Sequence, residues 1–234
     1  METFVASFDI GSRNFAFCIE KFDSNVLTNY KNINKDERYN EDGTCKSDFS
    51  EVLNDVYKNG ELVIFCNNDL LKGKKSTSYV DSENYYNMYE LLEEYKSYFD
   101  KCDVILIEQQ MSFGAKKYNT LALKLGQHCM SYFIYKYGKT KKVIEYPAYY
   151  KTITLGAPKV EKLLKSGKKS YKAMDKPARK KWAIVKCEEI LKIREDDETM
   201  KNLKTKKKKD DLSDVLIQLQ SFKFLYYVEN MKFK

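Results

Sequence analysis

Short apolar runs alternate along the chain with stretches of helical periodicity. Phe4 to Ile10 and Phe15 to Phe22 are rich in β-branched and aromatic residues, and they are separated by Gly11-Ser12-Arg13-Asn14. This pattern is typical of two strands joined by a turn. Because so short a connection cannot join parallel strands, we expect the two strands to pair antiparallel.

Further strands and helices follow in alternation. The predicted strands are Leu62 to Cys66, Val104 to Ile107 and Val143 to Tyr146, and the predicted helices are Asn84 to Phe99, Tyr118 to Tyr137, a helix from Pro177 through Leu191, and an amphipathic helix from Asp210 to about Phe224. Two antiparallel strands followed by strand and helix alternation favour a mixed α/β sheet flanked by helices.

Three segments lack clear periodicity. The polar stretch Ser24 to Asn59, apart from a short helix near Phe49 to Tyr57, indicates an insertion after the second strand, which we place at residues 27–60. Residues 151–175 are lysine-rich and contain glycines, so a mobile basic excursion is expected there, and Asp196 to Lys209 is expected to be a charged loop. A length of 234 residues favours a single domain over residues 1–234.

The positive charge is concentrated in one part of the chain. The net charge is +8, but Lys136 to Lys181 contains 15 Lys and Arg against three acids, a local excess of 12 that leaves −4 elsewhere. Tyrosines are interleaved with these lysines, as at Tyr171. Such a patch indicates a polyanionic partner, and lysines with aromatic residues can bind the phosphates and unstacked bases of nucleic acid. A solvated lysine-rich loop without a partner is the alternative.

Cysteine spacing and hydropathy exclude other classes. The six cysteines form no C-x-x-C pair, so they predict neither a zinc ribbon nor a disulfide framework. No apolar run approaches 18 residues and no basic start with an apolar stretch opens the chain. We therefore expect an intracellular protein with reduced thiols and no membrane contact.

Two acids follow apolar runs. Asp9 comes after Val5-Ala6-Ser7-Phe8 and Glu108 after Val104-Ile105-Leu106-Ile107. An ionised side chain at the inner edge of a strand is costly unless it is paired or bound to a metal. The alternatives are a turn aspartate at Asp9 and an ordinary strand-end glutamate at Glu108.

A third group of acids opens the last predicted helix. Asp211 and Asp214 are three residues apart, so both project from one helix face toward a shared ion. Asp210 could replace Asp211 at four-residue spacing, but as first helical residue it is better placed to cap the amides. Acids that simply favour the helix dipole are the alternative for all three.

Hard oxygen donors without a histidine partner are the ligand set of Mg²⁺, with Mn²⁺ as a possible substitute, rather than of zinc. The lone His128 is interpreted as a structural residue on a helix of otherwise core-like residues. With no histidine near the acids in sequence, water activated by two metal ions is the expected nucleophile in phosphodiester hydrolysis.

Four blocks of sequence resemble the poxvirus-type Holliday junction resolvases, which are similar to the RuvC-like resolvases of the RNase H-like superfamily. The blocks are F-D-I-G-S-R-N-F-A (Phe8 to Ala16), L-I-E-Q-Q (Leu106 to Gln110), Y-K-A-M-D-K-P-A-R-K-K-W (Tyr171 to Trp182) and K-K-D-D-L-S-D (Lys208 to Asp214). Their order and spacing agree over about two-thirds of the chain. The chain departs from the family in its extra length at residues 27–97 and 151–175.

The resemblance implies an RNase H-like mixed five-stranded sheet and a structure-selective DNA endonuclease. It would resolve four-way junctions by paired nicks, as a homodimer, leaving a 5′-phosphate and a 3′-hydroxyl, at viral replication sites in the host cytoplasm. The metal-binding acids would be Asp9, Glu108, Asp211 and Asp214, and Lys180 would be the lysine near the scissile phosphate. The residues expected to contact DNA are Arg13, Lys168, Lys169, Lys172, Arg179, Lys180, Lys181 and Lys208.

Two other functions remain open. The D-I-G-S sequence at Asp9 imitates the phosphate loop of sugar kinases and actin, but such phosphotransferases need a second glycine-rich loop, and the chain has only nine glycines. A catalytically silent nucleic-acid-binding protein would keep the fold and the basic patch. Acids at all four expected positions argue against that alternative.

Overall fold

The computed structural model describes residues 1–30, 33–75, 81–110, 120–164 and 166–233. The chain divides into two compact units. Unit 1 consists of Met1–Phe22 and Glu61–Ala148, and unit 2 of Asp23–Gly60 and Tyr149–Phe233. A single nuclease domain over residues 1–234 stays a prediction.

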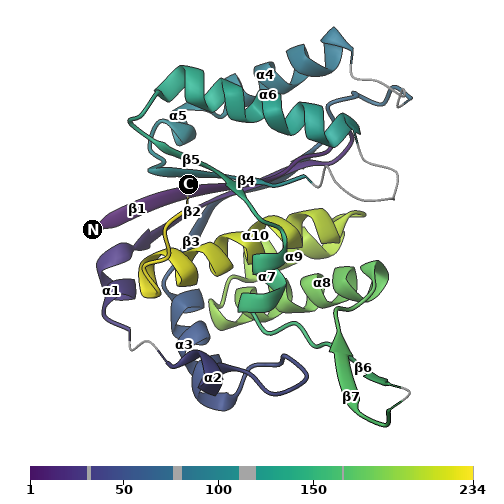
Figure 1. The fold of residues 1–234 in the computed structure, drawn as a ribbon. Coiled ribbons are helices and arrows are strands. Elements are labelled where there is room, and N and C mark those ends of the chain that lie inside the picture. Colours follow the sequence, from purple (N-terminus) through teal and green to yellow (C-terminus); the bar gives the residue numbers. More distant parts are fainter. Residues whose placement is uncertain (31–32, 76–80, 111–119, 165, 234) are drawn as a thin grey trace. The chain divides into compact units, whose positions relative to one another are not determined.

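Unit 1 is built on a five-stranded sheet (Figure 1). Its strands, in spatial order, are β3 (Glu61–Asn68), β2 (Phe15–Asp23), β1 (Glu2–Asp9), β4 (Val104–Glu108) and β5 (Lys142–Tyr146). β4 is parallel to β1 and to β5, whereas β3 is antiparallel to β2. The mixed α/β sheet predicted from the apolar pattern is therefore confirmed.

Helices α4 (Ser82–Glu94), α5 (Lys96–Phe99) and α6 (Thr120–Tyr137) cover one face of this sheet (Figure 1). The core on this face is aromatic: the Phe8 ring lies 5.2 Å from that of Phe17 and 5.4 Å from that of Phe133, centroid to centroid. Side chains on a strand alternate between faces, so the strand residues in this core occupy every second position. The predicted start of the α6 helix at Tyr118 lies outside the described residues.

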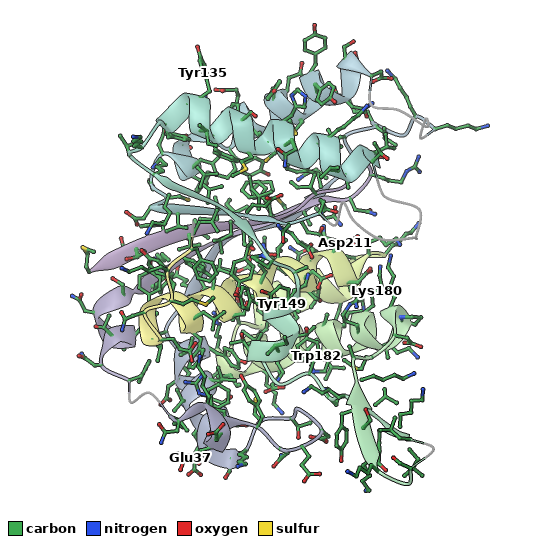
Figure 2. The ribbon with its side chains drawn as sticks, viewed as in Figure 1. Glu37, Tyr135, Tyr149, Lys180, Trp182 and Asp211 are labelled. Atoms are coloured by element: carbon green, nitrogen blue, oxygen red, sulfur yellow. The ribbon has the colours of Figure 1, made fainter. Side chains whose placement is uncertain are left out.

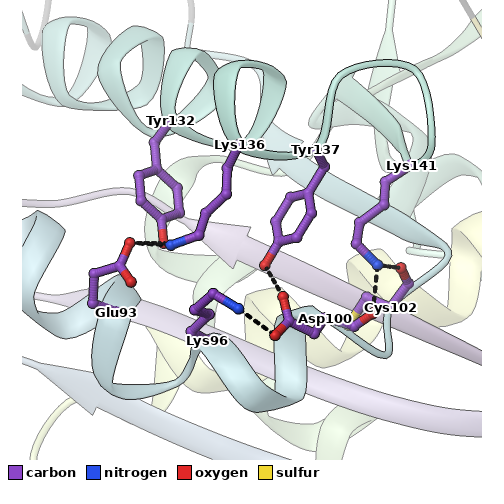
Figure 3. Close-up of polar contacts among 8 residues, drawn as sticks. All are labelled: Glu93, Lys96, Asp100, Cys102, Tyr132, Lys136, Tyr137 and Lys141. Carbon is purple, nitrogen blue, oxygen red and sulfur yellow. Dashed lines mark hydrogen bonds and ion pairs between the residues drawn. The ribbon is translucent and has the colours of Figure 1, made fainter.

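Polar contacts fasten α6 to α4 and α5 (Figure 3). The Tyr132 hydroxyl donates to Glu93 at 2.7 Å and the Tyr137 hydroxyl donates to Asp100 at 2.9 Å. Lys136 forms an ion pair with Glu93, and its ammonium also lies over the Tyr132 ring. One face of α6 therefore contacts α4 and α5 of the same unit.

Gly126 lies on the buried side of α6. Among the residues that the structure describes, a Cβ at this position would meet only the Gln110 Cγ, at an ordinary 3.8 Å. Ala122, Leu125, Cys129 and Phe133 of the same helix are buried. The apolar side of α6 therefore belongs to the core of unit 1.

Unit 2 is mostly helical. Its elements are α1 (Ser24–Thr28), α2 (Lys35–Arg38), α3 (Ser47–Lys58), α7 (Tyr149–Thr154), the hairpin strands β6 (Val160–Leu163) and β7 (Lys169–Lys172), α8 (Lys176–Ile193), α9 (Asp197–Thr205), α10 (Lys209–Lys223) and a π-helix, η1 (Phe224–Val228). α10 packs against α8, α7, α3 and α9. The helix expected after Pro177 begins at Lys176, with the Asp175 carboxylate accepting from the Ala178 amide at 2.9 Å.

The segment expected to be an insertion contributes to the core of unit 2. Phe49, Leu53, Val56 and Tyr57 of α3 are buried. The buried ammonium of Lys223 donates to the carbonyls of Val56 and Asn59 at 2.9 and 2.6 Å. A cation at the C-terminal carbonyls of a helix also opposes the negative end of its dipole.

In the segment 151–175 the structure describes most of α7 and the β6–β7 hairpin, and Lys151 is buried. A mobile, DNA-binding excursion there stays a prediction. Two sequence expectations for unit 2 were wrong. Asp196 to Lys209 is largely the helix α9 rather than a charged loop, and its Leu203 is fully buried. α10 is buried along almost its whole length instead of being amphipathic. In the part of the chain that the structure describes, no helix has the length and apolar character needed to cross a membrane.

Candidate functional site

Asp9 and Glu108 end adjacent parallel strands at the same level. The last paired residues of β1 and β4 are Phe8 and Ile107, and each acid follows its paired residue directly. Neighbouring strands lie about 4.8 Å apart. The sheet therefore brings these two acids together, as the apolar runs before them predicted.

The two carboxylates also project from the same face. Phe8 and Ile107 belong to the core under α4 and α6. Because strand side chains alternate, Asp9 and Glu108 point to the opposite face of the sheet. Both are half-buried. Two carboxylates in this arrangement can bind one divalent cation from two sides.

The acids of unit 2 lie at the start of α10. The helix begins at Lys209, and its N-cap, Lys208, makes no side-chain hydrogen bond to the helix amides. Asp210 therefore does not have the capping position that the sequence suggested. Its carboxylate forms an ion pair with Lys180 of α8 instead.

This ion pair shifts both groups toward their charged forms. The hydrogen bond from Lys180 to Asp210 raises the pKa of Lys180. Burial would raise the pKa of Asp210, but the hydrogen bond and charge of Lys180 hold it below its ordinary value. Asp210 is thus paired with a lysine of the neighbouring helix.

Asp214 has a lysine partner of its own. The Lys151 ammonium, on α7, lies 2.9 Å from the Asp214 Oδ1. The lysine side chain is 6% exposed and the aspartate side chain 22%. Sequence reasoning missed this pair, because nothing in the spacing distinguishes Lys151 from the exposed lysines that follow it.

Asp211 stands between Asp210 and Asp214 in the sequence, and its environment differs from that of either. Its Oδ2 is buried and has no hydrogen-bond partner among the residues that the structure describes. Burial, and then the negative charge of Asp210, raise the pKa of Asp211 to about 6. Figure 2 shows Asp211 on α10 close to Lys180 on α8.

An unsatisfied, buried carboxylate oxygen is the kind of donor that a cation would satisfy. Leaving such a group without a partner is costly, and oxygen donors suit Mg²⁺. The acids of each unit therefore fit a divalent cation in chemistry. Over the described ranges, no cluster of three or more His, Cys, Asp or Glu side chains is arranged to hold a metal ion.

The basic residues expected to contact DNA fall into three places. Arg13 lies in the β1–β2 turn of unit 1 and donates to the Lys74 carbonyl at 2.8 Å. Arg179 and Lys181 are exposed near the start of α8, and Lys208 is exposed before α10. Lys168, Lys169 and Lys172 lie on the β6–β7 hairpin and the turn before β7.

His128 lies on α6 of unit 1, among tyrosines. It is exposed on α6, where its ring lies 4.2 Å from that of Tyr85 and its Nδ1 3.4 Å from the Tyr89 hydroxyl. It is therefore a surface residue against tyrosines rather than the core histidine that its neighbours suggested.

Comparison with known proteins identifies viral relatives. The uncharacterized protein 170L of Invertebrate iridescent virus 6 is 37% identical over 240 residues, which cover 97% of this chain and 92% of the relative. The uncharacterized protein 97L of Invertebrate iridescent virus 3 is 29% identical over 224 residues, covering 93% of this chain and 98% of the relative. No protein-family model and no solved structure matches the chain.

Proposed function

The chain belongs to the family of protein 170L of Invertebrate iridescent virus 6, and we propose that it is a magnesium-dependent endonuclease that cuts branched DNA. The proposed preferred substrate is the four-way junction, cut by paired nicks. The proposed reaction is hydrolysis of a phosphodiester to a 5′-phosphate and a 3′-hydroxyl.

The equal register of Asp9 and Glu108 carries the proposal. Two acids far apart in sequence end adjacent parallel strands and share one face of the sheet. Two ionised carboxylates that end neighbouring strands on one face repel each other. A divalent cation between them would remove that repulsion.

The topology of unit 1 supports the same proposal. The strand order β3-β2-β1-β4-β5, with the hairpin strands first and the parallel strands after, is consistent with an RNase H-like arrangement. We propose that this is the fold of the sheet. The sequence blocks that resemble junction resolvases include the ends of β1 and β4 and the start of α10.

Each acid has a proposed role. Asp9 and Glu108 from unit 1, with Asp211 and Asp214 from unit 2, are the proposed ligands. A bound pair of Mg²⁺ ions would supply activation of the attacking water and stabilisation of the leaving oxygen. Lys151 forms an ion pair with Asp214 at 2.9 Å. Lys180 is the proposed lysine near the scissile phosphate; its side chain pairs with Asp210 and is 38% exposed.

Synthetic DNA substrates test this function directly. The purified chain is incubated with four-way junctions, flaps, loops and plain duplex, with Mg²⁺ and with EDTA. We expect cleavage that requires Mg²⁺ and is fastest on four-way junctions. Equal cutting of all substrates would reject the junction preference and keep the nuclease, whereas no cutting of any substrate with Mg²⁺ or Mn²⁺ would reject the nuclease.

A substitution that removes one ligand charge tests the site. Glu108→Gln should abolish cleavage and leave junction binding within about twofold, because only the charged oxygen is lost. The matched control is Glu61→Gln on β3, whose exposed carboxylate pairs with Lys21. Cleavage by Glu108→Gln at the rate of the control would refute the site.

Paired nicks require two active sites, so we also propose a homodimer. Sedimentation equilibrium should give twice the chain mass of 27.6 kDa. A monomer that still cuts both strands of a junction would contradict this. Because the relatives are viral, the proposed place of action is the viral replication site in the host cytoplasm, which fluorescence microscopy of infected cells can check.

A further inference from the structure

The β6–β7 hairpin of unit 2 has two chemically different faces. Its register pairs Val160 with Lys172, Glu161 with Tyr171, Lys162 with Ser170, and Leu163 with Lys169. The Leu164 amide donates to the Lys168 carbonyl at 2.9 Å, which extends the ladder by one pair. Paired residues share a face and successive residues alternate, so the faces can be assigned residue by residue.

One face is neutral in charge and fastened to the rest of unit 2. It carries Glu161, Leu163, Lys169 and Tyr171. The Lys169 ammonium lies 3.1 Å from the Glu161 carboxylate, and the Tyr171 hydroxyl donates to Glu41 at 3.4 Å. Lys169 is therefore already offset by an acid.

The other face carries three lysines and no acid. It carries Lys162, Lys168 and Lys172, together with Val160, Leu164 and Ser170. The three lysines are exposed, and no acid among the described residues forms an ion pair with any of them. We call these three lysines the basic face. The sequence pattern alone did not separate Lys162 from Lys169, because the separation depends on which strand positions are paired.

Apolar side chains are exposed at the end of the same hairpin. Leu163 is 66% exposed and Leu164 is 45% exposed, next to the turn closed by the Gly167 amide on the Leu164 carbonyl. We call these two leucines the tip. Figure 1 shows the hairpin extending from unit 2 beyond α8. Much of each leucine side chain is therefore in contact with solvent.

We propose that the hairpin is a DNA-binding ribbon whose basic face holds phosphates and whose tip fills the space between unstacked bases at a branch point. The inference rests on the proposed function and adds to it the element that recognises the branch. Charge complementarity selects the partner, since three unpaired lysines on one face suit a polyanion.

Branched DNA suits the tip better than continuous duplex does. At a branch the stacking of base pairs is already interrupted, so an apolar side chain can enter at a lower cost than the few kcal/mol that unstacking a step in intact duplex requires. The apolar contact then adds affinity only at the branch. Phosphate contacts by the basic face are made on any duplex and carry no such preference.

Binding without cleavage measures both parts of the hairpin. The Glu108→Gln chain is titrated in Mg²⁺-free buffer with a four-way junction carrying 2-aminopurine at the branch, and with a duplex of equal length. Combined Lys162→Gln, Lys168→Gln and Lys172→Gln should reduce the slope of log K against log salt by about 2 to 3 on both DNAs. Combined Leu163→Ser and Leu164→Ser should weaken junction binding about tenfold, leave duplex binding unchanged and abolish the rise in 2-aminopurine fluorescence.

Matched controls distinguish the effect of the basic face from the effect of a lower net charge. Combined Lys35→Gln, Lys58→Gln and Lys192→Gln removes the same charge from exposed positions elsewhere in unit 2 and should leave the slope unchanged. Lys169→Gln should change it by less than one, because Glu161 already offsets that charge. Thermal melting checks each fold, and the single variant Lys162→Glu repeats the test with one exposed substitution.

The outcomes distinguish the hairpin from the nuclease. If the wild-type chain cuts junctions and the basic-face and tip variants bind like the parent, the hairpin inference is overturned and the nuclease stands. If these variants lose binding as expected but the wild-type chain cuts no DNA with Mg²⁺, the hairpin inference stands and the nuclease falls. Equal losses in the Lys35, Lys58 and Lys192 control would also overturn the inference.

Discussion

The Lys151 ammonium lies 2.9 Å from the Asp214 carboxylate, and the lysine side chain is only 6% exposed. The pair joins α7 to α10 inside unit 2. It supplies a positive charge one helical turn from Asp211, whose own buried oxygen has no hydrogen-bond partner in the described part of the chain. The acids at the start of α10 are therefore held in different electrostatic states by their neighbours.

Lys151→Met should reduce the free energy of unfolding by about 3 kcal/mol, because a largely buried carboxylate loses its counter-charge. Urea unfolding measures this. Lys169→Met is the control: its pair with Glu161 is exposed, so it should cost less than about 1 kcal/mol. Adding Asp214→Asn to Lys151→Met should recover part of the loss. A cost for Lys151→Met equal to that of the control would contradict the buried pair.

Asp211→Asn should stabilise the metal-free chain. The folded pKa of Asp211 is raised to about 6 from 3.8, so the ionised side chain destabilises the fold above about pH 6. The destabilisation shrinks as pH falls through 6 and vanishes near 3.8, where the carboxyl is protonated in both states. After allowance for solvent screening we expect a gain of about 1 kcal/mol at pH 8, or roughly 2–4 °C in Tm, and none near pH 4.

The same variant tests Asp211 as a ligand. Mg²⁺ that binds only the folded wild-type chain should raise its Tm as concentration increases, and the rise should be smaller for Asp211→Asn. Scanning calorimetry with and without Mg²⁺ at pH 8 measures both. An identical rise in the two chains would remove Asp211 from the proposed ligands.

Gly156→Ala should destabilise unit 2 by about 2 to 4 kcal/mol, because two penalties add. The backbone at Gly156 has a φ of +72°, and a Cβ there would lie 2.9 Å from the Cys45 amide nitrogen and closer still to its Sγ. At Gly167 φ is +75°, and no described residue lies within 4 Å of an added Cβ, so Gly167→Ala should cost only the backbone penalty of about 1 to 2 kcal/mol. Chemical unfolding of the two variants compares them; equal losses would show that the contact with Cys45 contributes nothing.

Lys180→Met should slow junction cleavage on the order of 100-fold with little change in junction affinity, because the role proposed for this lysine is to stabilise the charge that develops on the phosphate. Lys181→Met, at the next and more exposed position of α8, is the control and should change the rate less than tenfold. Single-turnover rates with Mg²⁺ measure both. A larger effect at Lys181 would exchange the two assignments.

The elements that carry strong periodicity were predictable. Val104 to Ile107 was expected as a buried strand and lies in β4, and the helix after Pro177 is α8, whose start is set by local capping at Asp175. The short helix expected near Phe49 to Tyr57 is α3. The helix α9 was missed because it is short and rich in charged residues, and the burial of Leu203 that accompanies it is shown by no local pattern.

The sequence by itself determined the candidate acids and the place of the positive charge. Asp9 and Glu108 follow apolar runs, Asp211 and Asp214 are three residues apart, and a lysine-rich segment follows β5. These are local properties, readable because period and spacing reflect the geometry of one strand or one helix. Only tertiary structure decided the equal register of Asp9 with Glu108, the partners of Asp210 and Asp214, and which hairpin lysines remain unpaired. Those relationships depend on strand pairing and burial between residues that are far apart in sequence. The local sequence around each residue does not show which distant residue it will contact.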